Sequence, residues 1–136
     1  MKSMTALMAL GCACVLVGGT PAQAHHAVQA SVDVDRTVVT KAVLTKIDWI
    51  NPHTWMHFDM VTADGQMHKD VLVESLGINA LRKVGFDSKS NFKIGDTYDI
   101  SFYPNRDGTF GGFMNHMVLP DGRSFDTKNT DPGATQ

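Results

Sequence analysis

The residues of this chain best suited to chemistry are its six histidines, which all lie after residue 24: His25, His26, His53, His57, His68 and His116. Imidazole is the commonest protein ligand for zinc, copper and nickel, and its neutral form is abundant near neutral pH. No serine lies in a glycine-flanked nucleophile turn, and the sequence has no glycine-rich phosphate-binding motif. The residue types therefore favour metal binding over nucleophilic catalysis.

The first two histidines directly follow a segment with the anatomy of a secretory signal peptide. It has a basic start at Lys2, an apolar run over about residues 4–17, and the small-residue cleavage motif Ala22-Gln23-Ala24. We predict that residues 1–24 are removed and that the mature chain begins at His25. We also predict that this mature chain is periplasmic or secreted.

Removal of the leader changes the composition of the chain. Both cysteines, Cys12 and Cys14, lie in the leader, so the mature domain has neither thiol nor disulfide. A lipoprotein leader modified at Cys12 is the alternative, and the position of Leu10 disfavours it. Cleavage leaves 11 basic and 14 acidic residues, a formal charge of −3, and no basic patch that indicates nucleic-acid binding. The leader's apolar run is shorter than the ~20 residues of a membrane-spanning helix, so we expect no membrane span.

Once it is the first residue, His25 offers one ion two donors, the α-amino group and ring Nδ1. The amine has a reference pKa of about 7.7–8.0, so a strongly Lewis-acidic ion displaces its proton near neutrality. This arrangement resembles the histidine brace of copper proteins, in which a second histidine completes the ligand set. Copper is favoured first and zinc second, because Cu(II) heads the divalent affinity series and prefers tetragonal nitrogen ligands. The alternative is that the His25-His26 arm binds metal no better than a histidine tag.

Two later histidines are candidates to complete such a site. His53 follows Asn51 and Pro52 in a turn between two predicted strands, where a stiff backbone would hold the imidazole in place. The alternative is a turn in which His53 only bonds the backbone. Strand alternation predicts that His116 shares one face with Met114 and Val118, so it is the next candidate ligand. The remaining two, at positions 57 and 68, are interpreted as surface residues.

The pattern of β-branched and turn residues predicts a mainly β domain. We expect strands over residues 37–50, 54–62, 67–74, 98–103 and 113–119, and one short helix near residues 78–84, started by Ser75 or Asn79 and ended by Gly85. This order is that of a small five-stranded OB-like barrel with one helix between strands three and four. An open α+β sheet is the alternative. The expected domains are an N-terminal arm at 25–36, the barrel at 37–126 and a loose tail at 127–136.

An OB-like barrel makes a prediction about distance. His53 falls in the loop after the first strand, and residues 105–112 form the loop after the fourth. We expect these loops to lie on the same side of the barrel, so that His53 meets the start of the fifth strand.

The methionines near the histidines suggest Cu(I) ligands, since thioethers are soft donors. Alternation instead places Met56, Phe58 and Met60 on one strand face, which is typical of core. Small OB-barrel copper chaperones of the bacterial periplasm use histidine, methionine and tryptophan, and Trp55-Met56-His57 is loosely similar to that set, although its spacing differs.

Several motifs occur together in this chain: His25-His26, Trp49-Ile50-Asn51-Pro52-His53, Asn79-Ala80-Leu81 and Gly95-Asp96. On these the mature domain resembles a family of small exported bacterial proteins of unknown function. Members of that family open with His-His-Ser-Phe and carry a glycine in the first strand, whereas this chain has Ala27-Val28 and Ala42. The resemblance implies that His25, His26 and His53 belong to one site, and it names no reaction.

Three functions are consistent with the sequence. The first is a periplasmic metal-binding protein for carriage or sequestration, in which the metal ligands come from His25, His26, His53 and His116 and a periplasmic or membrane protein receives the ion. The second is a module that binds an apolar small molecule or a partner protein through the loops around Trp49, Trp55 and Phe110. The third is a histidine-dependent or copper-dependent enzyme, for which the sequence shows no substrate pocket.

Overall fold

The computed structural model describes residues 30–86 and 90–127. The predicted signal peptide, His25, His26 and nearly all of the predicted tail lie outside the described residues. The elements follow the chain in this order: β1 (Val38–Asp48), β2 (His53–Val61), β3 (Met67–Leu76), α2 (Ile78–Lys83), β4 (Thr97–Pro104), β5 (Gly111–Val118) and β6 (Ser124–Asp126).

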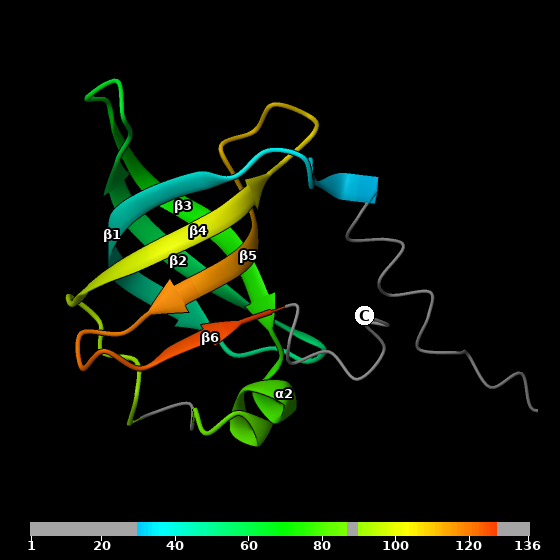
Figure 1. Cartoon of the computed structure of the whole chain (residues 1–136), viewed down its shortest axis with the longest axis vertical. Coiled ribbons are helices and arrows are strands. Elements are labelled where there is room, and N and C mark those ends of the chain that lie inside the picture. Colours follow the sequence, from blue (N-terminus) through cyan, green and yellow to red (C-terminus); the bar gives the residue numbers. More distant parts are fainter. Residues whose placement is uncertain (1–29, 87–89, 128–136) are drawn as a thin grey trace, which may run out of the picture.

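Five of these strands close into a β-barrel. The sheet has the order β3-β2-β1-β4-β5-β6, and β3 also pairs with β5 in parallel over residues 72–74 and 111–113. This last pairing joins β3, at one end of the order, to β5 and so closes the ring, while β6 pairs with the last part of β5 outside the five-stranded ring (Figure 1). The predictions of a mainly β fold, a five-stranded barrel and a helix between the third and fourth strands are confirmed.

Close backbone approach makes the closure possible. A Cβ atom at Gly111 would collide with the carbonyl of Leu72 on β3, and one at Gly112 would collide with the carbonyl of Tyr103 on β4. Glycine is required wherever two backbones approach this closely. The Gly111-Gly112 pair therefore permits β5 to fit between its two neighbours.

Alternation along the strands supplies the barrel interior. On β2 the side chains of Met56, Phe58 and Met60 are buried, as the sequence predicts, and they pack with buried residues from every other barrel strand. Burying each such side chain removes apolar surface from water and contributes roughly 1.5–3 kcal/mol. The interior-facing methionines are Met56, Met60, Met114 and Met117, which are all nearly inaccessible.

Aromatic residues and α2 close one end of the barrel. Phe86 lies 5.1 Å from Phe125 and 6.0 Å from Phe92, as measured between ring centroids. The helix begins after Gly77 without a side-chain cap, so the predicted caps Ser75 and Asn79 are wrong. Ser75 is instead a buried residue of β3. Among the described helices, none is long and apolar enough to cross a membrane.

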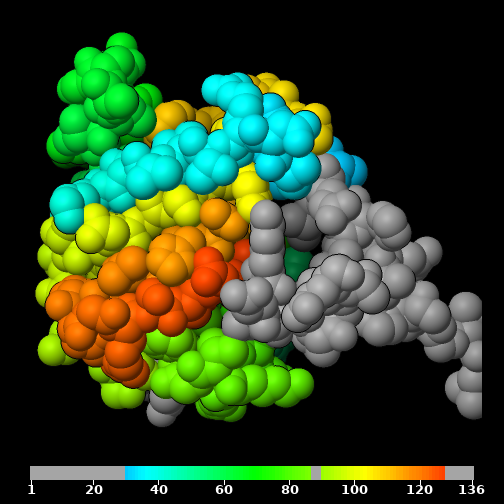
Figure 2. All heavy atoms as spheres, in the orientation of Figure 1, coloured from blue at the N-terminus to red at the C-terminus, as the bar shows by residue number. Residues whose placement is uncertain are grey.

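The described part of the N-terminal arm docks on the barrel. Val32 is buried and forms an isolated β-bridge with Asn105, and the amide of Arg106 donates a hydrogen bond of 2.9 Å to the carbonyl of Ser31. Figure 2 shows this segment lying along the body of the molecule, while the β2–β3 hairpin projects from it at the upper left. The arm therefore leaves the barrel beside the β4–β5 loop.

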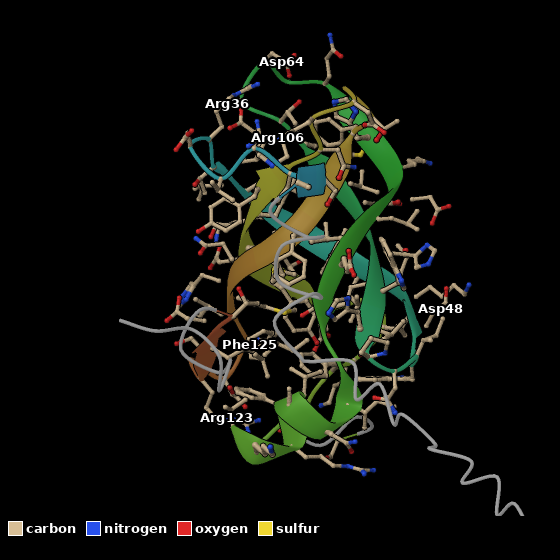
Figure 3. All side chains as sticks on the ribbon, turned by 90° about the vertical axis from the view of Figure 1, so that its right-hand side faces the viewer. Arg36, Asp48, Asp64, Arg106, Arg123 and Phe125 are labelled. Atoms are coloured by element: carbon tan, nitrogen blue, oxygen red, sulfur yellow. The ribbon has the colours of Figure 1, made fainter. Side chains whose placement is uncertain are left out.

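One expectation about the loops is wrong. The antiparallel alternation of the strands places the β1–β2 connection at the same end as α2, whereas the β4–β5 loop lies at the opposite end with the β2–β3 turn (Figure 1). Figure 3 shows the same separation, with Arg106 and Asp64 toward one end of the molecule and Phe125 toward the other. His53 nevertheless meets the start of β5, because the barrel stagger sets the last part of β3 beside the first part of β5.

Candidate functional site

The corner between β1 and β2 presents His53 on a fixed backbone. His53 is the first residue of β2 rather than part of the loop, and it follows a cis peptide bond between Asn51 and Pro52. Trp49 packs against the core, with its ring centroid 6.0 Å from that of Phe92. On the other side, a Cβ atom at Gly77 would collide with the carbonyl of Pro52. The corner is thus packed on two sides, against Phe92 and against Gly77.

The His53 side chain lies on the outer face of the barrel between an acid and an aromatic ring. Its Nδ1 atom forms an ion pair with Glu74 of β3, and its ring packs edge-on against Phe113 of β5 with centroids 6.0 Å apart. The side chain is 27% exposed. The hydrogen bond to Glu74 raises the pKa of His53, against partial burial, which lowers it. No other described residue forms a hydrogen bond with Nε2 of His53. This nitrogen is therefore the one available to bind a metal ion or another ligand.

His116 shows the same arrangement on another part of the sheet. Its Nδ1 atom lies 2.7 Å from a carboxylate oxygen of Asp126 on β6. The expected alternation is wrong here, because Ser101 pairs with His116 while Phe102 pairs with Met114, which leaves Asn115 as an extra residue in β5. This bulge turns His116 outward although Met114 is buried in the interior.

These two histidines do not form one ready metal site. His53 is bound to an acid on β3 and His116 to an acid on β6. Over residues 30–86 and 90–127, no group of three or more histidine, cysteine, aspartate or glutamate side chains is arranged to hold an ion. The described residues therefore supply at most part of a ligand set, and His25 and His26 lie outside them.

The expectation for His57 is also wrong. This histidine was expected at the surface, but it is 7% exposed, with Nδ1 2.6 Å from Asp70 and Nε2 3.0 Å from Asp48. Both ring nitrogens are thus occupied and neither is available to a metal. The sequence contains Asp48 and Asp70 but gives no strand register, which is what brings them to either side of the imidazole.

The aromatic residues of the alternative binding module do not share one surface. Trp49 packs at the α2 end of the barrel, whereas Phe110 stacks on His68 at the opposite end with ring centroids 3.9 Å apart. This stacking places His68 at the surface, as expected, at the end of the barrel that carries the β4–β5 loop. Met56 of the Trp55-Met56-His57 segment is fully buried, so it cannot reach a ligand shared with its neighbours.

Comparison with known proteins identifies the family of the chain. Residues 13–115 match the family of unknown function DUF6152. This match confirms the resemblance to a family of unknown function that the motifs indicate. No curated protein and no protein of solved structure matches the chain.

Proposed function

Since the chain belongs to the DUF6152 family, whose function is unknown, its role has to be inferred from its own chemistry, and we propose that it is an exported metal-binding protein. In this proposal residues 1–24 are a signal peptide, and His25 binds the ion through its amine and its ring. His53 completes the set, assisted by His26 or His116. Copper is the first candidate and zinc the second.

The geometry of His53 is the observation that carries the proposal. Histidines that bind metals usually donate the second ring nitrogen to a carboxylate, which fixes the ring and makes the free nitrogen a better donor. Glu74 takes Nδ1 of His53 in this way, and Nε2 is the nitrogen that the proposal assigns to the metal ion. The same relation between His116 and Asp126 supports a secondary role for His116.

The docked arm fixes the point on the barrel from which the chain leads back to His25. Val32 and Ser31 are attached to the β4–β5 loop, which leads into β5, and Phe113 of β5 contacts His53. Position 25 lies five residue steps before position 30, and an extended chain of five steps spans at most about 18 Å. The proposal requires the imidazole of His53 to lie within this reach.

Carriage or sequestration fits this arrangement better than turnover. The proposed ligand His53 lies on the outer face of the barrel, where an ion can be passed to another protein. A site completed by a terminal segment can also open without unfolding the barrel.

The test is calorimetric titration of Cu(II) and Zn(II) into the purified mature chain, after its N-terminal residue has been established by mass spectrometry. An added alanine before His25 removes the terminal amine from the imidazole, and His53→Gln removes the barrel ligand. We expect each change to weaken copper binding by at least about tenfold, because loss of a residue that only orients a ligand already costs roughly 10–100-fold in metal affinity.

His68→Gln is the matched control, because His68 is a surface histidine that the proposal does not use. Equal copper affinity of the native chain and the chain with the added alanine would overturn the proposed role of the amine. Loss of affinity in His68→Gln as large as in His53→Gln would show that binding is nonspecific.

A further inference from the structure

His57 lies on the outer face of the barrel, where a polar side chain is ordinarily exposed to water. It is nevertheless buried. Its strand partners are Lys46 on β1 and Leu72 on β3, which flank it on the two neighbouring strands. Two carboxylates complete the enclosure, Asp48 from β1 and Asp70 from β3. A single side chain of β2 thereby joins its two neighbouring strands.

The hydrogen-bond chemistry of this cluster requires a charged ring. An ionised carboxylate only accepts hydrogen bonds, so each nitrogen of His57 must carry a proton to bond both acids. Only imidazolium has two such protons, and neutral imidazole turns one lone pair toward an acid. We infer that His57 is a proton-dependent bridge, which bonds Asp48 of β1 and Asp70 of β3 at once while it is doubly protonated and gives up one of these two bonds when a proton is lost to solvent.

The charges around His57 are consistent with the doubly protonated form. On β1, Lys46 lies 2.8 Å from Asp48, and the hydrogen bond from Lys46, followed by that from His57, lowers the pKa of Asp48. On β3, the Asp70 amide donates to Asp59 of β2 at 3.0 Å. Of the other charged residues on β3, Lys69 is exposed and Glu74 is paired with His53.

The backbone of β3 is shaped to make this contact. Asp70 has a positive φ of 53°, which is uncommon for a residue other than glycine and carries a conformational cost. It lies where the β2–β3 register shifts between Phe58 and Met60. This irregularity directs the Asp70 carboxylate to His57 rather than along a regular strand.

Asp48 is the partner that is released. Its contact with His57 is the longer of the two, and it retains Lys46 as a partner after the proton leaves. Asp48 is also the last residue of β1. Loss of the proton therefore removes a side-chain contact at the end of β1, where Asp48 lies in Figure 3, while the backbone of Asp48 stays paired with Trp55 of β2.

The test combines nitrogen NMR of the His57 ring with denaturant unfolding of the purified chain between about pH 5 and pH 9, the range in which histidine changes charge. We expect both ring nitrogens to carry protons at the acidic end and one of them at the basic end. Over the same range the folding equilibrium constant of the native chain should fall about tenfold relative to that of His57→Gln, the change expected for one charged hydrogen bond. His53 titrates in both proteins, so its contribution cancels in this comparison.

Two further variants keep the inference testable if His57→Gln does not fold. Asp48→Ala changes a side chain that is 34% exposed and leaves no acceptor, so it should abolish the slowly exchanging Nε2 proton while leaving the Nδ1 proton in place. His68→Gln should retain the full pH dependence of the native chain. A His57 ring with a single proton throughout the range, or equal pH dependence in the native chain and His57→Gln, would overturn the inference.

Discussion

The imidazole of His53 and the carboxylate of Glu74 are bound diagonally across two strands. His53 pairs with Leu76 in the β2–β3 ladder and Glu74 pairs with Trp55, so the two bonded side chains are offset by two residues. Such diagonal neighbours lie on the same face of a sheet and within reach of long side chains. The ion pair therefore depends on the strand register and reports on it.

The first prediction concerns the charge of His53. Glu74→Gln removes the negative charge of the acceptor that raises the pKa of His53, so that pKa should fall toward or below the ordinary value of 6.5. Because the native pKa is raised, the pair contributes stability that is fully present below the ordinary value. This contribution is lost as the pH rises through the raised value. Proton NMR titration of His53 gives the pKa, and urea unfolding at several pH values gives the stability.

The stability difference between the native chain and Glu74→Gln should accordingly be largest near pH 5 to 6 and shrink toward pH 8. Asp126→Asn, which changes the equivalent acid beside His116, is the control and should leave the His53 titration unaltered. A difference that grows with rising pH would contradict the assignment of Glu74 as the principal partner.

The second prediction concerns the arm. Val32 is 3% exposed but does not belong to the main core cluster, so Val32→Asp should release the arm and leave the barrel folded. An unpaired buried carboxylate is unfavourable enough to drive this release. The Arg106 amide, which donates to Ser31, should then exchange faster with solvent, as measured by hydrogen exchange.

The arm variant also separates two steps of the metal proposal. If docking positions His25, copper affinity should fall in Val32→Asp although every proposed ligand is present. Val34→Asp is the control, because Val34 is 43% exposed and its replacement should change neither exchange nor affinity. Unchanged affinity in both variants would mean that the terminal residue finds His53 without the docked arm.

The barrel could be predicted from the sequence because its strong signals are local. Alternation on β2 predicts the burial of Met56, Phe58 and Met60, and the period change near residue 78 predicts the single helix. These patterns depend on residues close in the chain. The order of elements then leaves few topologies, of which the closed barrel is one.

The details of the site depend on irregularities that local patterns do not encode. The extra residue Asn115 reverses the alternation of β5, so that Met114 and His116 lie on opposite sides of the sheet. The positive φ of Asp70 similarly brings an acid to His57. Both are bulge-type features whose position is set by tertiary packing, and each changes which histidine nitrogens are available.

The third prediction distinguishes core methionines from exposed ones. Met114 is fully buried whereas Met67 is 58% exposed, so Met114→Ala should cost about 2–5 kcal/mol of unfolding free energy and Met67→Ala less than about 0.5 kcal/mol. Denaturant unfolding measures both values. Similar small losses would mean that Met114 does not fill the barrel interior.

The fourth prediction tests whether the position of His53 matters for metal binding independently of stability. A Cβ atom at Gly77 would collide with the carbonyl of Pro52, so Gly77→Ala must displace the corner that carries His53. Overpacking of this kind costs about 1–3 kcal/mol. We expect copper affinity, measured by calorimetry, to fall by about tenfold or more, because a ligand displaced by an ångström no longer fits the ion's geometry.

Gly65→Ala provides the matched loss of stability at a distant position. Gly65 has a φ of +82° and no neighbouring atom within 4 Å of an added Cβ, so its replacement costs about 1–2 kcal/mol through backbone strain alone. It lies in the β2–β3 turn, at the end of the barrel opposite the corner. Two equally destabilised variants of which only Gly77→Ala loses copper would locate the site at the corner. Equal loss of copper in both would attribute the effect to reduced stability and remove the corner from the ligand set.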